Sequence, residues 1–277
     1  MLKSTFDALL SALDRFNRHH GWTMSSHVAL SMMLALFPFA IFSLSVASGF
    51  VGKVDTADLT RLIYGTWPEM IAEPIEKELL AVLEQSGVRS LTLGGLLALF
   101  FASNGVDAIR SALVMAYHEE DPLNFWRSRA RCLLFVLGGA ALMTTVLYFA
   151  VGLPFKLAIF KLTHPQMSTE FLTVDRLNLA IGVALLTAGL VACHIWLTGK
   201  RHRVRDVLPG VVLTLVLWGV AAQLFGYYIN EFATYSVTYA GLASVMAALI
   251  FLYLMAALFI LGAEFNGRLI AARKETA

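Results

Sequence analysis

Six long apolar stretches constrain the fold of this chain more than any other feature. Each is long enough to cross the roughly 30 Å hydrocarbon core of a bilayer as a helix, which takes about 20 residues. Lipid offers no hydrogen-bond partner to the backbone, so such stretches must be helical or belong to a closed barrel. The stretches are Ser25–Val51, Leu91–Tyr117, Cys132–Ile159, Leu177–Leu197, Val207–Ile229 and Gly241–Ala263.

The pattern within the stretches favours helices over barrel strands. Barrel strands alternate polar and apolar residues over about ten positions, whereas Leu242–Ala263 carries no charge and almost no polar side chain. Only 14% of the residues are charged, against about 25% in soluble domains. Six spans and their connections consume nearly all of the 277 residues. We therefore predict an all-α membrane protein, with six transmembrane helices in a single polytopic domain over residues 1–277.

The placement of positive charge predicts the orientation in the membrane. Lys and Arg in short loops are retained on the cytoplasmic side. Thirteen of them fall in the segments on one side of the predicted spans, seven fall on the other side, and Arg110 lies inside a span. The first outer loop also holds seven acidic residues between Asp55 and Glu84. Both termini are therefore expected in the cytoplasm, with residues 53–90 outside.

Two segments outside the spans are predicted to be helical. Residues 1–22 form an amphipathic pattern, which suits a helix lying in the cytoplasmic interface or one packed on the cytoplasmic ends of the bundle. Its apolar positions are Leu2, Phe6, Leu9, Leu10, Leu13 and Phe16. The outer loop 53–90 contains two short helical patterns, Asp58–Trp67 and Pro74–Gln85, which Pro68 and Pro74 separate. We expect a helical hairpin on the outer face.

Ionisable residues inside the spans are the first candidates for a functional site. Such residues tend to face a bundle interior or a water-filled cavity. Asn104, Asp107 and Arg110 follow one another at three-residue spacing, so they share one helix face. Glu264, at the end of the sixth span, falls at a comparable depth. These residues could line an ion or substrate path, with Arg110 paired to Asp107 or Glu264; they could equally form structural pairs near helix ends.

The fifth span carries a second polar group near its outer end. Gln223 and Asn230 are seven residues apart and therefore share a helical face, which fits a lined vestibule. The tyrosines around them are also typical of an aromatic belt at the interface. At the other end of this span, Pro209 and Gly210 are expected in the first helical turn, where proline is tolerated.

Motifs for metal binding, hydrolysis and phosphate cradling are missing from the sequence. The seven histidines show no clustered ligand spacing, and Cys132 and Cys193 both fall in or beside spans, as small buried residues do. The basic run Lys200–Arg205 lies next to the membrane, where anionic lipid explains it better than nucleic acid. We expect no cofactor, no metal site, no nucleic-acid partner and no enzymatic activity.

Several motifs together resemble the YihY/BrkB family of bacterial inner-membrane proteins. They include Arg205-Asp-Val-Leu-Pro-Gly210, Leu224-Phe-Gly-Tyr-Tyr-Ile-Asn230, Leu261-Gly-Ala-Glu-Phe-Asn266, Leu36-Phe-Pro38 and Ala102-Ser-Asn104 with Asp107. The resemblance implies a six-span protein of the plasma membrane with both ends inside. Some members have been labelled ribonuclease BN, but this sequence lacks the His-x-His-x-Asp-His zinc ligands that such a nuclease needs. Other members carry a virulence tag or look like cation/proton antiporters.

Two functions of different classes follow from these features. The first is a secondary transporter of cations or a small envelope solute, with a path lined by Asn104, Asp107, Arg110, Gln223, Asn230 and Glu264. The second is a non-transporting envelope protein that acts through lipids or protein partners. Both require the lipid bilayer, with anionic lipid at the cytoplasmic face as a further partner, and both leave room for a homo-oligomer.

Overall fold

The computed structural model describes six ranges of the chain, and every element in them is helical. These ranges are residues 2–51, 88–117, 123–147, 174–200, 202–232 and 240–275, with side chains described inside 7–36, 98–117, 123–142, 182–200, 202–228 and 245–273. The helices are α1 (Leu2–Arg18), α2 (Gly21–Val51), α5 (Val88–Ala116), α6 (Phe125–Leu147), α8 (Val174–Ala192), the π-helix η2 (Cys193–Leu197), α9 (Val204–Phe232) and α10 (Ala240–Glu275). The prediction of an all-helical chain is confirmed for these ranges.

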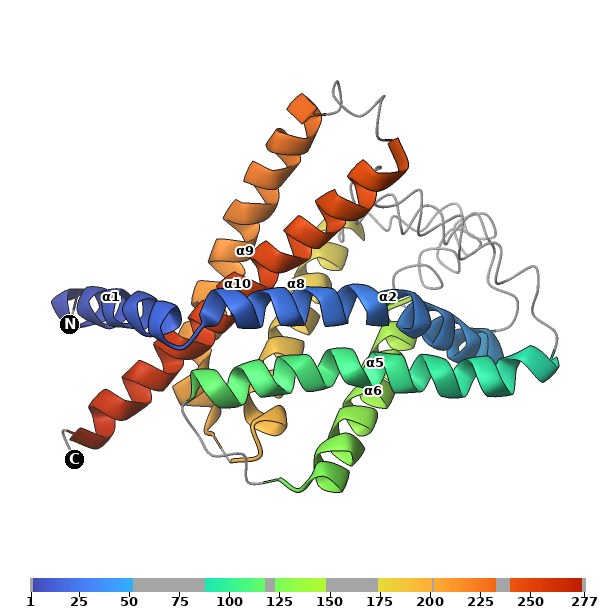
Figure 1. Ribbon diagram of the computed structural model, residues 1–277, viewed down its shortest axis with the longest axis horizontal. Coiled ribbons are helices and arrows are strands. Elements are labelled where there is room, and N and C mark those ends of the chain that lie inside the picture. Colours follow the sequence, from blue (N-terminus) through green and yellow to red (C-terminus); the bar gives the residue numbers. More distant parts are fainter. Residues whose placement is uncertain are drawn as a thin grey trace, which may run out of the picture.

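The helices run in two main directions (Figure 1). α2 and α5 lie side by side and antiparallel, and both pack against the steeper helix α6. α10 runs obliquely and packs against α9 and α2. α1 packs on the C-terminal part of α10. The contacts between α5, α6, α9, α10 and η2 form the interior in which most buried polar residues lie.

Three helices within the described residues are long and apolar enough to cross a membrane. They are Ala98–Ala116 in α5, Val204–Tyr228 in α9 and Val245–Arg273 in α10, while Gly182–Leu197 forms a shorter apolar helix. The number of six spans stays a prediction. Much of the first and third stretches lies outside the residues with described side chains, and the described part of the fourth, Gly182–Leu197, is shorter than a span. The predicted hairpin of the outer loop likewise falls on residues 52–87, outside the described ranges.

α9 presents a continuous apolar stripe that winds across its exposed surface. Large exposed residues recur every four positions over about 36 Å, the rise of 24 helical residues, which is enough to traverse the hydrocarbon core. They are Val204, Leu208, Val212, Val216, Val220, Leu224 and Tyr228. The opposite face of α9, with Val207, Val211 and Thr214, is buried. This division suits a helix with lipid on one side and protein on the other.

The sequence at the crossing of α9 and α10 allows the two backbones to touch. A Cβ atom on Gly210 would lie 2.1 Å from the carbonyl oxygen of Gly262, and one on Gly262 would lie 2.1 Å from Oγ1 of Thr214. Real side chains essentially never approach so closely, so glycine is required at both positions. Small residues at such crossings are typical of helix packing in membranes.

α1 packs on α10 with one face. Ala8 and Ala12 are buried against Phe265, whereas Leu10 and Leu13 remain exposed. Between α1 and α2 the backbone of His20 has a φ of 55°. A side chain at Gly21 would meet the Phe16 ring at 2.4 Å, so glycine permits this tight connection. The structure therefore places α1 on the bundle and leaves an apolar part of its surface available to an interface.

Two helices extend beyond the predicted span cores near the polar residues, and the predicted place of Pro209 in the first turn is wrong. α10 continues to Glu275 rather than stopping near Ala263, because the polar residues that follow Ala263 are buried against neighbouring helices. α9 begins at Val204, three residues before the predicted start. Pro209 is therefore the sixth residue of the helix and lies beyond its first turn.

Candidate functional site: a charged cluster between α5 and α6

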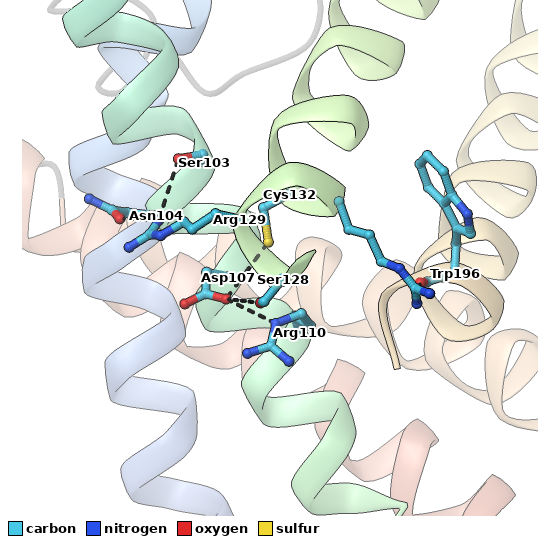
Figure 2. A network of polar contacts seen from close by, with 9 residues as sticks. Ser103, Asn104, Asp107, Arg110, Ser128, Arg129, Cys132 and Trp196 are labelled. Atoms are coloured by element: carbon cyan, nitrogen blue, oxygen red, sulfur yellow. Dashed lines mark hydrogen bonds and ion pairs between the residues drawn. The ribbon is translucent and has the colours of Figure 1, made fainter. Parts of the chain in front are cut away.

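An ion pair in α5 forms the centre of the candidate site (Figure 2). Nε of Arg110 donates to Oδ1 of Asp107 over 2.9 Å, one helical turn away. The Arg110 side chain is 8% exposed and that of Asp107 is 31% exposed. Both residues lie inside the candidate span Ala98–Ala116. The predicted pairing of Arg110 with Asp107 is confirmed.

α6 supplies the second wall of the cluster. Oγ of Ser128 donates to Oδ1 of Asp107 over 3.2 Å, and Sγ of Cys132 lies 3.7 Å from the same oxygen. Both residues belong to a buried stripe at four-residue spacing, which continues through Val136 and Ala140. The Asp107 carboxylate is thus bound from two helices, and a movement of α6 against α5 would change its hydrogen bonds.

Arg129 brings a second guanidinium to the cluster. Its Nη1 donates to Oδ1 of Asn104 over 2.6 Å and lies 3.4 Å from Oγ of Ser103. The rings of Phe100 and Phe125 flank the guanidinium, with centroids 5.8 and 5.7 Å from its central carbon. Figure 2 shows this arginine reaching across α5 toward Asn104, on the Ser103 side of Asp107.

A buried junction of four elements lies around Asn266 of α10. Its Oδ1 accepts from the backbone N–H of Gly210 at 2.7 Å, and its Nδ2 donates to the carbonyl of Val207 at 2.8 Å. The side-chain amide therefore bonds the α9 backbone on both sides of Pro209. Asn266 is fully buried, so it couples the end of α10 to the start of α9 through groups that water cannot reach.

The same junction reaches a buried histidine through a tyrosine hydroxyl. Nδ2 of Asn266 donates to the hydroxyl of Tyr117 over 3.4 Å, and this hydroxyl lies 2.8 Å from Nδ1 of His194 in the π-helix η2. The Tyr117 hydroxyl, which can both donate and accept, therefore connects Asn266 of α10 to His194. Within the described residues Nε2 of His194 has no hydrogen-bond partner.

We expect Asn266→Ala to lower the free energy of unfolding by about 2–4 kcal/mol, because buried polar groups that lose a partner cost about 1–3 kcal/mol each. Reversible unfolding in mixed micelles measures the change. Gln223→Ala is the matched control, since Gln223 is exposed on α9 and surface substitutions usually change stability by less than about 0.5 kcal/mol. Equal stability of the two variants would contradict the junction's role.

Glu264 lies on the other side of α10, beside α1. Its side chain is 2% exposed, and Oε1 lies 3.4 Å from Nδ1 of His19. Partial burial lowers the pKa of His19, and the charges of Arg15, Arg18 and His20 lower it further. His19 is therefore neutral at neutral pH, and its contact with Glu264 is a hydrogen bond rather than a pair of full charges.

The structure thus distributes the predicted site residues over separate places. Asn104, Asp107 and Arg110 gather in the α5–α6 cluster, whereas Glu264 contacts α1. Gln223 is exposed on α9, and the side chain of Asn230 lies outside the described residues. Among those residues no three His, Cys, Asp or Glu side chains come together as a metal site.

Sequence reasoning missed the partners that other helices supply. Arg129 is one of the thirteen basic residues whose placement predicts the orientation, and no motif in the sequence singles out Ser128. The stripe from Ser128 through Cys132 to Val136 and Ala140 is the signal that could have placed this face of α6 toward α5. No comparable pattern connects Tyr117, His194 and Asn266.

The long apolar helices, the exposed stripe of α9 and the buried charges in α5 define an integral membrane protein with an α-helical fold. The family model described as Virulence factor BrkB matches residues 12–277. The chain belongs to this family, as the resemblance of its motifs indicated.

The relatives of this chain include proteins that are named as membrane proteins. YfkH of Bacillus subtilis (strain 168), whose name describes it as ribonuclease-like, is 27% identical over 274 residues, which cover 96% of each chain. A UPF0761 membrane protein of Xanthomonas axonopodis pv. citri (strain 306) is 25% identical over 260 residues, or 90% of this chain. This chain spans 58% of the length of that protein. No solved structure matches the chain.

Proposed function

We propose that the protein is a secondary transporter of cations or a small envelope solute, and that the α5–α6 cluster is its binding site. The observation that carries this proposal is the Asp107–Arg110 ion pair within a candidate span. An isolated charge at the centre of a membrane helix costs about 2.5–3.5 kcal/mol on insertion scales. Such residues are rare in spans and mark ion and substrate paths in many transporters.

The geometry supports a mechanism based on exchange of partners. The Asp107 carboxylate contacts Arg110 of its own helix and Ser128 of α6. A proton or a bound cation at Asp107 would compete with Arg110 for the carboxylate, because either would reduce the negative charge that attracts the guanidinium. Release of the bond from Ser128 would then let α6 move relative to α5. This is the local change that alternating access requires.

We further propose that the protein resides in the bacterial inner membrane with both termini in the cytoplasm. The bilayer is its main partner, with anionic lipid bound at the cytoplasmic face and a homo-oligomer as an assembly to be tested. We propose neither a nucleic-acid partner nor a cofactor, metal or enzymatic role. The excess of Lys and Arg in one set of segments supports the orientation.

Single cysteines at Lys200 and Glu76 test this orientation in a background with Cys132→Ala and Cys193→Ala. A membrane-impermeant maleimide added to intact spheroplasts should label the cysteine at position 76 and leave that at position 200 unlabelled until the membrane is permeabilised. Labelling of position 200 but not of position 76 would reverse the proposed topology.

Flux measurements in proteoliposomes test the transport proposal itself. The full chain is reconstituted, and Na⁺, K⁺ and H⁺ gradients are imposed one at a time while ion and pH indicators are recorded. We expect at least one gradient to drive flux that depends on the protein. Reconstituted wild-type protein without flux under any gradient or added solute would favour the non-transporting envelope protein instead.

A further inference from the structure

Arg129 gives the α5–α6 cluster an excess of positive charge. Among the described residues the cluster holds two guanidiniums, Arg110 and Arg129, and one carboxylate, Asp107. Asp107 bonds Arg110, whereas Nη1 of Arg129 bonds only the neutral oxygens of Ser103 and Asn104. Of the two ligand classes proposed above, an excess of positive charge favours a small anionic solute over a cation. Arg129 is therefore oriented by neutral hydrogen-bond partners, and the two guanidiniums share a single carboxylate.

We propose that Arg129 binds a phosphate-bearing anion between the start of α6 and the middle of α5. This deepens the proposed function by naming the substrate class, and it rests on that function only for the step of transport. The shared chemistry is a phosphate group, carried by a free anion or by a lipid headgroup.

Among the described residues, the hydrogen bonds of Arg129 use only one of its three guanidinium nitrogens. In the part of the chain that the structure describes, its Nε and Nη2 atoms have no hydrogen-bond partner. A guanidinium offers paired N–H groups that match two phosphate oxygens. The bond to Asn104 and the rings of Phe100 and Phe125 hold the plane of the group. Holding it in place lowers the entropic cost of binding an anion.

The surroundings suit an amphiphilic anion as well as a free one. Phe125 is 66% exposed and Trp126 is 80% exposed, so large aromatic surfaces adjoin the arginine at the end of the helix. Tryptophan and other aromatic residues settle at the level of lipid headgroups. Basic sites between membrane helices bind anionic headgroups there. An exposed arginine such as Arg127 shares the charge but not these positioning contacts.

Calorimetric titration of the purified full chain in neutral detergent tests the site. One arm adds inorganic phosphate, and the other adds dioleoylphosphatidylglycerol in mixed micelles, with dioleoylphosphatidylcholine as the zwitterionic comparison; chloride keeps the ionic strength constant. We expect saturable binding in at least one of the first two arms. Binding of phosphatidylglycerol alone identifies a lipid headgroup, and binding of phosphate identifies a free anion.

Three variants assign the binding to Arg129. Arg129→Gln should weaken binding of the anion at least about tenfold. Arg129→Lys, which keeps the charge but loses the paired N–H donors of the guanidinium, should weaken it about threefold or more. Arg203→Gln, an equal change of charge at the exposed residue before α9, should change it less than about twofold. If Arg129→Gln does not fold, Arg129→Lys decides.

The proposal fails if the wild type binds neither ligand saturably. It also fails if Arg129→Lys binds as tightly as the wild type, or if Arg129→Gln and Arg203→Gln weaken binding equally. Titration needs no gradient, so it tests binding independently of transport. Saturable binding without flux would support the anion site and contradict the proposed transport. Flux without Arg129-dependent binding would do the reverse.

Discussion

Alanine at Gly210 should destabilise the protein by about 3 kcal/mol or more, because α9 and α10 would have to separate. The added Cβ would lie 2.1 Å from the carbonyl oxygen of Gly262 and 2.5 Å from the side-chain amide of Asn266. The first of these atoms is backbone, so no side-chain rotation removes the clash. A displaced Asn266 would also lose its bonds to α9.

A glycine farther along the same helix provides the control. A Cβ on Gly219 would meet no atom within 4 Å, and alanine favours a helix over glycine by roughly 0.5–1 kcal/mol. Gly219→Ala should therefore keep or raise the melting temperature, while Gly210→Ala lowers it and reduces the yield of monodisperse protein. Equal melting temperatures of the two variants would show that the α9–α10 contact is looser than described.

The second large effect concerns the ion pair in α5. Asp107→Ala should cost about 2–3 kcal/mol, because it leaves the buried Arg110 without its carboxylate. We place the value below that for fully buried pairs, since Asp107 is 31% exposed. The double variant Asp107→Ala/Arg110→Leu should recover most of the loss, because it removes both charges together.

Unfolding of the two single variants and the double variant in mixed micelles gives the coupling energy of the pair. Arg203→Leu, at an exposed position, controls for the loss of a positive charge. Additive losses in the double variant would mean that Asp107 and Arg110 do not stabilise each other. No loss in Asp107→Ala would mean that water or another group satisfies Arg110.

Much of the helical framework could be predicted because it depends on local composition. The apolar stretches from Leu91 and from Leu177 reappear as α5 and as α8 continued by η2, with ends displaced by a few residues. The polar end of α10 could not be predicted. In the sequence alone, Glu264 and Asn266 mark the edge of a membrane span. In the structure, His19 at the end of α1 contacts Glu264, whereas α9 and Tyr117 bond Asn266.

The candidate site shows the same division between local and distant contacts. Asp107 and Arg110 are three residues apart on one helix, so their pairing follows from helical geometry alone. The contact of Arg129 with Asn104 depends instead on the rotation of α6 against α5. Charge counting assigned Arg129 to topology, and only the packing of Ser128 and Cys132 against α5 shows where it points.

Transport by the pair-neutralised protein tests most directly whether the α5–α6 cluster binds what the protein carries. Asp107→Ala/Arg110→Leu is compared with the wild type in proteoliposomes, under the gradient that drives the largest wild-type flux, at equal amounts of folded protein. We predict normal folding, wild-type orientation in the liposomes and flux reduced to the protein-free background. Wild-type flux from the double variant would contradict the proposal and leave the ion pair with a purely structural role.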